Sequence, residues 1–294
     1  MDLSTLIIAV FCEVDDWFME QEKLRGRGPE PTLSDSEVLT IEIVGEFLGI
    51  DAEKDLYAYF KHHYAEWFPA LREVHRTTFT RQMANLWVAK ERLWRYLLHR
   101  RIDFDPAISL VDSFPVPVCR FARAYRCRLL PEESAFGYDE MSKQTFYGLR
   151  AHLRVCWPGV VLGVDLAPAN IHDLCMAEEL LEGAKEGWVL GDRNYWSPDL
   201  AEQFEAEGMR LLAPYKSKKR EEEPWPRWLV QKRRRIETVF SQLIERYRAK
   251  KVWAKDRWHL TSRFMRKVLS HTMAVYFCQQ VGLSPLRFAK LLTD

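Results

Sequence analysis

The sequence has no apolar run long enough to cross a lipid bilayer. Its apolar stretch near the start, LIIAVF at residues 6–11, is far shorter than the roughly 20 residues that a spanning helix needs. It also lacks the basic residues that precede the apolar part of a secretion signal. We therefore expect a core helix at this position and no membrane partner.

Cysteine is scarce and irregularly placed. The six cysteines form no CxxC pair and no regular spacing, so neither the common zinc motifs nor a disulfide framework is indicated. Reduced thiols are expected, as in a cytoplasmic protein. Repeats and low-complexity segments are absent too, and 47% apolar with 29% charged residues is typical of a folded chain of one large or two ordinary domains.

Net charge is small as well, at +1, but charges of opposite sign are segregated along the chain. Residues 1–60 contain 14 Asp and Glu against 4 Lys and Arg, whereas residues 216–257 contain 15 Lys and Arg against 6 Asp and Glu. Such segregation favours a polyanionic partner for the C-terminal half. The acidity of residues 1–60 argues against their helices as the main contact with DNA.

Residues 1–105 are predicted to form an all-helical N-terminal domain. Ser34, with Glu37 three residues later, matches a helix-capping box. Further helices are expected at 52–64 and 77–98. Short helices with tight connections are compatible with a DNA-binding helix-turn-helix, and equally with a small bundle that binds no DNA.

Residues 106–294 are predicted to form a second domain of the α+β or α/β class. Three strands joined by short turns come first, followed by helix, strand, helix, strand, a charged loop and a helix. This order is that of a ribonuclease H-like fold, a mixed five-stranded sheet with helices on its faces. Residues 115–143 form an irregular basic insertion. In the second strand, alternation places Arg150 and Arg154 together on one face.

Two aspartates stand where apolar strands end. Asp112 closes ISLVD and Asp192 closes WVLGD, and in the predicted strand order these two strands are neighbours. Glu237 follows three arginines in the basic segment VQKRRRIETVFSQLIERYRAKK and lies on the flank of its predicted helix. An aspartate at a strand end is also common as a turn or N-cap residue, and Glu237 could form an ordinary surface ion pair with Arg233. Three converging carboxylates, in contrast, could hold two Mg²⁺ ions, with Mn²⁺ as a substitute, for phosphoryl transfer.

The segments LVDSFPVPV, VLGDRNYWS and RRRIETVFSQL together resemble the DDE transposases of bacterial insertion sequences. The nearest group is the family named after insertion sequence 982, and the resemblance covers the whole chain. It implies that Asp112, Asp192 and Glu237 are the catalytic and metal-binding triad.

The surroundings of the glutamate depart from the pattern of related families. Those families often place Tyr, Arg and Lys at seven before, four before and seven after the glutamate. Arg233 matches, whereas Val230 and Ile244 do not, and Arg248 could substitute for the missing Lys. The departure concerns the clamping of phosphate rather than the triad.

The resemblance implies a DNA transposase that acts in DNA recombination. Such an enzyme cleaves DNA at terminal inverted repeats as a metal-dependent endonuclease and joins the 3′-OH ends to target DNA. Its partners would be double-stranded DNA and further copies of itself, as a homodimer or larger synaptic complex. The alternatives are an inactive or domesticated DNA-binding protein on the same fold and a structure-selective nuclease.

The contacts with DNA are predicted from side-chain chemistry. Phosphate contacts are expected at Arg150, Arg154, Arg233, Arg234 and Arg248. Base contacts are expected from the helix at 76–94, at Arg81 and Gln82, or otherwise from the basic insertion. Trp253 or Trp258 could stack on an unpaired base, although most tryptophans belong to the core.

Overall fold

The computed structural model describes residues 1–294 except residues 23, 25–27, 185, 215–226 and 293–294. The charged loop expected at 215–226 thus lies outside the described residues. The chain divides into two compact units, the first of residues 1–102, 245–249 and 256–294, and the second of residues 103–244 and 250–255. The C-terminal helix therefore belongs to the first unit, in contrast to the prediction of one domain over 106–294.

The first unit is helical. Its helices are α1 (Leu3–Glu20), α2 (Asp35–Phe47), α3 (Glu53–His63), α4 (Arg76–Asn85), α5 (Trp87–Arg100) and α9 (Arg257–Gln280), with short 3₁₀ turns η1 (Pro69–Arg72) and η7 (Phe288–Lys290). The capping box is confirmed, because Ser34 Oγ accepts from the Glu37 N–H at 3.1 Å and the Ser34 N–H donates to the Glu37 carboxylate at 2.7 Å. The single helix expected at 77–98 is wrong: the chain breaks at Leu86 into α4 and α5. No helix of the described residues is long and apolar enough to cross a bilayer.

Part of the acidity of the first 60 residues is neutralised inside this unit. Glu42 of α2 forms a buried ion pair with Lys90 of α5 at 2.7 Å. Glu46, one turn further along α2, pairs with Arg266 and Lys267 of α9. A buried charge is costly unless it is paired, so these contacts tie α2 to both helices specifically.

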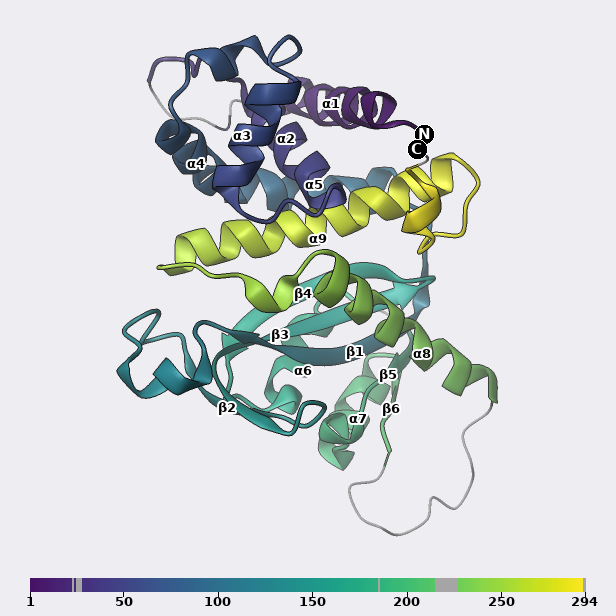
Figure 1. The fold of residues 1–294 in the computed structure, drawn as a ribbon. Helices are drawn as coiled ribbons and strands as arrows, with labels where there is room; N and C mark the ends of the chain where they lie inside the picture. Colours follow the sequence, from purple (N-terminus) through teal and green to yellow (C-terminus); the bar gives the residue numbers. More distant parts are fainter. Residues whose placement is uncertain (23, 25–27, 185, 215–226, 293–294) are drawn as a thin grey trace. The chain divides into compact units, whose positions relative to one another are not determined.

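The second unit is built on one mixed sheet (Figure 1). Its strands are β1 (Asp105–Pro117), β2 (Ala135–Asp139), β3 (Gln144–Trp157), β4 (Val160–Pro168), β5 (Gly187–Leu190) and β6 (Met209–Leu212), in the order β2-β3-β1-β5-β6 with β4 also paired to β3. The β3–β4 hairpin and the parallel β1–β5 pairing agree with the predicted ribonuclease H-like order. A sixth strand was not expected; it arises because β2, inside the basic insertion, adds to the free edge of β3.

The helices of this unit are short except for one. They are η2 (Phe121–Arg126), η3 (Asp173–Met176), α6 (Ala177–Leu181), η4 (Arg193–Tyr195), α7 (Pro198–Ala206) and α8 (Arg227–Ser241), after which the chain continues as the π-helical turn η5 (Gln242–Arg246) and the 3₁₀ turn η6 (Ala249–Lys251). The helical segment therefore changes character before Arg248, whose φ of 52° lies in the left-handed region. Arg248 therefore lies outside the α-helix that carries Glu237, and its substitution for the missing Lys stays a prediction.

The two faces of β1 meet different helices. Val111 belongs to an apolar cluster with residues of α6 and α7, such as Ala177 and Phe204. Phe114 points to the other face, where its ring packs edge-on against Phe240 of α8 at 5.2 Å between centroids. Side chains of a strand alternate between its two faces, so Asp112 lies on the same face as Phe114, the face that packs against α8.

Candidate active site

Asp112 and Asp192 come to the same level at the end of two parallel strands. The last residues that pair between β1 and β5 are Leu110 and Leu190, and each aspartate lies two residues further on. Strand β1 continues to Pro117, so Asp112 does not end its strand as the sequence suggested; it marks the point where β5 stops. The carboxyl end of a strand in such a sheet is a common place for a ligand site.

Each aspartate is fixed by the backbone beside it. The Ser113 N–H donates to Asp112 Oδ1 at 2.8 Å. Asp192 caps the 3₁₀ turn η4, accepting from the N–H of Asn194 at 2.8 Å and from the Asn194 side-chain amide at 3.2 Å. The N-cap role considered for Asp192 is therefore present, and it orients the carboxylate.

The electrostatics of the pair are unfavourable without a cation. Burial raises the pKa of Asp112 to about 7, and the negative charge of Asp192 adds to the effect. Burial also raises the pKa of Asp192 above its ordinary value. Two carboxylates that repel each other in a half-buried place present hard oxygen ligands of the kind that divalent cations such as Mg²⁺ take.

A third carboxylate, Asp173, lies beneath the pair and was missed by sequence reasoning. Its side chain is only 6% exposed. It accepts hydrogen bonds from Ser113 Oγ at 2.7 Å and from the Asn194 amide at 3.2 Å, and so connects the residue after Asp112 to the residue that holds Asp192. In the sequence, Asp173 opens a short helical turn and cannot be told apart from an ordinary helix-start aspartate.

Buried polar groups surround Asp173. His152 Nδ1 lies 3.4 Å from Asp173 Oδ1, and burial lowers the pKa of this histidine to about 4, so the ring is neutral near pH 7. The hydroxyl of Tyr195 is buried too, and no hydrogen-bond partner for it is present among the described residues. Burial, together with the charges of Asp173, Asp112 and Asp192, raises the pKa of Tyr195. The side chains of His152, Asp173 and Tyr195 behind the aspartates are therefore shielded from solvent.

Helix α8 brings one basic residue to the aspartates. The guanidinium of Arg233 acts on both Asp112 and Asp192, opposing the rise in their pKa values. Glu237 lies one turn further along α8 and is exposed. The described residues contain no group of three His, Cys, Asp or Glu side chains placed to hold a metal ion together. Membership of Glu237 in the triad thus stays a prediction.

Other basic residues of α8 have a packing role. The ammonium of Lys232 lies 3.3 Å from the ring centroid of Trp157, and the guanidinium of Arg235 lies 4.7 Å from it. These cation–π contacts hold α8 on the end of β3. Of the basic run, Arg234 remains exposed for contact with a partner.

Two of the predicted DNA contacts are buried. Arg154 is 8% exposed and donates to Ser109 Oγ at 3.0 Å, because α6 packs on the face of β3 that the alternation assigned to solvent. Gln82 donates to the Leu33 carbonyl at 2.9 Å and to Asp35 at 2.8 Å within the helical unit. Both expectations of free side chains are wrong, since helices pack on faces that the local pattern left open.

The remaining predicted contacts keep some accessibility. Arg81 and Arg248 are exposed. Arg150 is half-buried and donates to Ser113 Oγ at 3.3 Å and to the Tyr138 carbonyl at 2.9 Å. Arg150 therefore supports the loop beside Asp112, and its role towards phosphate stays a prediction.

The ribonuclease H-like sheet carries two aspartates level with each other where β5 ends, an arrangement expected of a nucleotidyl-transfer enzyme. The family model described as "Transposase DDE domain" matches residues 105–252, a range that contains Asp112, Asp192 and Glu237. The chain belongs to this family of DDE transposases, and it is therefore a DNA transposase.

A solved structure gives the same fold. The chain is similar to the piggyBac transposase in a cryo-EM structure of a synaptic complex with hairpin DNA, with a TM-score of 0.50 and 10% identity over 99% of this chain and 79% of that one. At this identity the similarity concerns the fold alone. No curated protein matches the chain at the level of sequence.

Proposed function

We propose that this transposase cleaves DNA at the terminal inverted repeats of its element and joins the resulting 3′-OH ends to target DNA. Asp112, Asp192 and Glu237 are the catalytic carboxylates of this proposal. The observation that carries it is the parallel register of β1 and β5, which sets Asp112 and Asp192 level where β5 ends.

Asp112 and Asp192, with Glu237 from α8, would hold two Mg²⁺ ions, with Mn²⁺ as a substitute. The chemistry of the donors supports this assignment, because all three are carboxylates and the charge of Asp192 raises the pKa of Asp112. Bound divalent ions make a water or a 3′-hydroxyl a better nucleophile and stabilise the leaving oxygen.

The chain's own residues have separate tasks in this reaction. Arg233, beside both aspartates, would contact the non-bridging oxygens of the scissile phosphate as their charge grows. Asp173 and Asn194 keep Asp192 in one orientation from beneath. Tyr195, fully buried behind the carboxylates, keeps bulk water from the back of the site.

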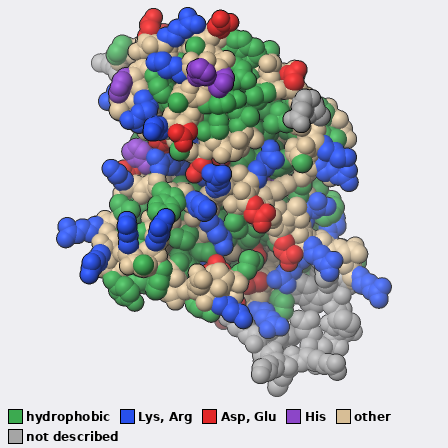
Figure 2. Space-filling model, in the orientation of Figure 1, with side chains coloured by type: hydrophobic (Ala, Val, Ile, Leu, Met, Phe, Trp, Pro, Cys, Tyr) green, Lys and Arg blue, Asp and Glu red, His purple; other side chains and the backbone are tan. Residues whose placement is uncertain are grey.

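The partner in this proposal is double-stranded DNA, held by sequence-independent contacts between arginine and phosphate. Figure 2 shows Lys and Arg side chains on the basic insertion, at the left of the view, with hydrophobic side chains between them. Joining two transposon ends in one complex requires at least two copies of the chain, so a homodimer or larger assembly is part of the proposal. The similar piggyBac structure is itself a synaptic complex with hairpin DNA.

The test is strand transfer by the purified protein on DNA that carries the terminal repeats, with Mg²⁺ or with EDTA. Asp112→Asn, Asp192→Asn and Glu237→Gln should each abolish nicking and joining while DNA binding is retained, since an amide keeps the shape and removes the charge that a hard cation needs. Glu245→Gln, at another exposed glutamate, is the matched control and should remain active.

Each alternative predicts a different result. Binding without metal-dependent nicking would identify an inactive DNA-binding protein. Nicking of branched DNA without preference for the terminal repeats would identify a structure-selective nuclease. Near-normal turnover by any one of the three carboxylate variants would remove that residue from the triad.

A further inference from the structure

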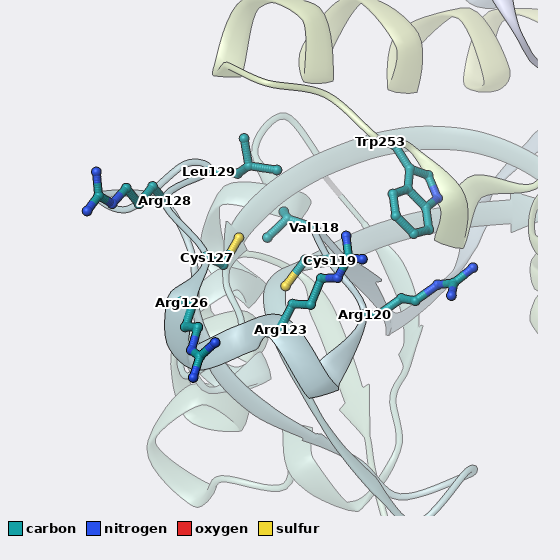
Figure 3. Close-up of a pocket in the computed structure, with 9 residues that line it drawn as sticks. All are labelled: Val118, Cys119, Arg120, Arg123, Arg126, Cys127, Arg128, Leu129 and Trp253. Carbon is teal, nitrogen blue, oxygen red and sulfur yellow. The ribbon is translucent and has the colours of Figure 1, made fainter.

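A pocket of about 710 Å³ lies between the basic insertion and the segment that follows η6 (Figure 3). All of its lining belongs to the second unit. The lining residues are Val118, Cys119, Arg120, Arg123, Arg126, Cys127, Arg128, Leu129 and Trp253. The catalytic proposal uses none of them, and the volume is that of a site for a ligand of nucleotide size.

The charge of this arginine pocket is of one sign. Four arginines line it, all four are exposed, and its lining includes no Asp or Glu. Within the part of the chain that the structure describes, none of these arginines is ion-paired with a carboxylate. Arginine has planar donors that suit the oxygens of phosphate, so a lining with four arginines and no carboxylate favours an anionic ligand.

The floor of the arginine pocket is uncharged. Cys119 and Cys127 lie beside each other there, and burial together with the neighbouring thiol raises the pKa of Cys119 to about 11. Val118, which is buried, continues this floor. The pocket thus combines a cationic rim with a neutral, partly apolar bottom, as a ligand with both a phosphate and an aromatic ring requires.

Trp253 supplies a flat aromatic wall. Its side chain is 52% exposed although it lines the pocket. The segment that carries it is held to β2, because Lys250 Nζ lies 3.3 Å from Asp139 Oδ2. Within the segment, the Trp253 N–H donates to the Lys251 carbonyl at 3.0 Å. The indole therefore faces the insertion from a fixed backbone, and Figure 3 shows its ring across from Arg120 and Arg123.

The insertion carries more exposed rings. Tyr125 is exposed, and its ring lies 6.4 Å from that of Phe121 and 5.2 Å from that of Phe136. Exposed aromatic rings among arginines are typical of surfaces that bind unpaired nucleic acid, because each base can stack on a ring while arginine contacts the backbone. Binding to the phosphates of a duplex alone does not require exposed aromatic rings.

We propose that the arginine pocket binds an unpaired deoxynucleotide of the DNA substrate, with the base stacked on Trp253 and the phosphate held by Arg120 and Arg123. A base inside an intact duplex has both faces covered by its neighbours. The indole can therefore stack only on a base that has left the helix or lies beyond its end. This inference rests on the proposed action on DNA and adds the state in which the DNA is held.

The test measures binding of three probes by fluorescence anisotropy, with the full chain in EDTA. The probes are labelled dT12, a blunt duplex, and the same duplex with a dT4 tail. Trp253→Ala should weaken binding of dT12 and of the tailed duplex by about 5- to 100-fold and leave the blunt duplex unchanged. Trp253→Phe, which keeps a stacking face, should restore most of the loss.

Two further variants separate stacking from charge and from general damage. Arg123→Ala should weaken binding of all three probes and reduce the salt dependence by about one phosphate contact. Trp67→Ala is the matched control: this residue of the first unit is 43% exposed, its ring packs on that of Tyr64, and binding should not change.

The outcomes separate the pocket from the proposed reaction. Equal binding of dT12 by the wild type and by Trp253→Ala, or an equal loss on the blunt duplex, would overturn the inference. A loss on dT12 but not on the tailed duplex would assign the pocket to a free strand, and the reverse would assign it to a strand end. Failure of the wild type to nick DNA would count against the reaction and leave the binding contrast intact.

Discussion

Replacing Asp112 by asparagine should make the metal-free protein more stable while it abolishes the reaction. The pKa of Asp112 lies at about 7 against an ordinary value of 3.8, because the carboxylate is buried beside Asp192. Asparagine keeps the acceptor that the Ser113 N–H uses and removes the charge that the folded state holds at a cost. The metal site would then be a place where stability is given up for function.

The size and the sign of the effect follow from the pKa. One pKa unit corresponds to about 1.4 kcal/mol, so ionising Asp112 in the folded state costs about 2–4 kcal/mol once contact with solvent is considered. Because the folded pKa is raised, the unfolded chain ionises first. The free energy of unfolding of the wild type therefore falls, relative to Asp112→Asn, as pH rises from about 4 to about 7.

The assay is denaturant unfolding of wild type and Asp112→Asn in EDTA at pH 5 and pH 8, followed by titration with Mg²⁺. The advantage of the variant should be larger at pH 8 than at pH 5. Mg²⁺ should stabilise the wild type by about 3 kcal/mol at one hundred times its dissociation constant and should have little effect on the variant. Glu202→Gln, at an exposed position of α7, is the control and should change little at either pH. A variant that is less stable than the wild type at pH 8 in EDTA would refute the reasoning.

Three further predictions follow from single contacts. Asp173→Asn should lower the rate of nicking about 10- to 100-fold and weaken Mg²⁺ binding, since it places an amide against the amide of Asn194; unchanged metal affinity would contradict this positioning role. Gln82→Ala should lower the free energy of unfolding by about 1–3 kcal/mol and leave specificity for DNA unchanged, because the side chain is hydrogen-bonded inside the helical unit. Arg81→Ala should reduce specificity if α4 contacts bases. Specificity is measured as the ratio of binding to terminal-repeat DNA and to scrambled DNA. Gly187→Ala should destabilise the sheet by about 1–3 kcal/mol, measured by thermal unfolding, because φ is 125° and a Cβ would lie 2.2 Å from the Ala107 carbonyl oxygen.

Local rules determined a large part of the fold. The capping box at Ser34 depends on two side chains three residues apart, so the sequence states it directly. The order of strands and helices after residue 105 follows from apolar runs and turns, and that order restricts the sheet to few topologies. The neighbouring positions of Asp112 and Asp192 follow from this topology, because β1 and β5 pair in parallel and each aspartate lies two residues beyond the last pair.

Local sequence patterns could not predict which faces of the helices and strands are buried by other parts of the chain. Arg154 and Gln82 lie at positions that alternation and helical period leave open, and only packing by distant segments buries them. Asp173 was missed for the same reason. In the sequence it is an ordinary aspartate at a helix start, and only the fold brings Ser113 of β1 and Asn194 of the turn after β5 within hydrogen-bond distance of it. Burial and long-range hydrogen bonds are properties of the whole chain, so the tertiary structure alone decided which polar residues are structural.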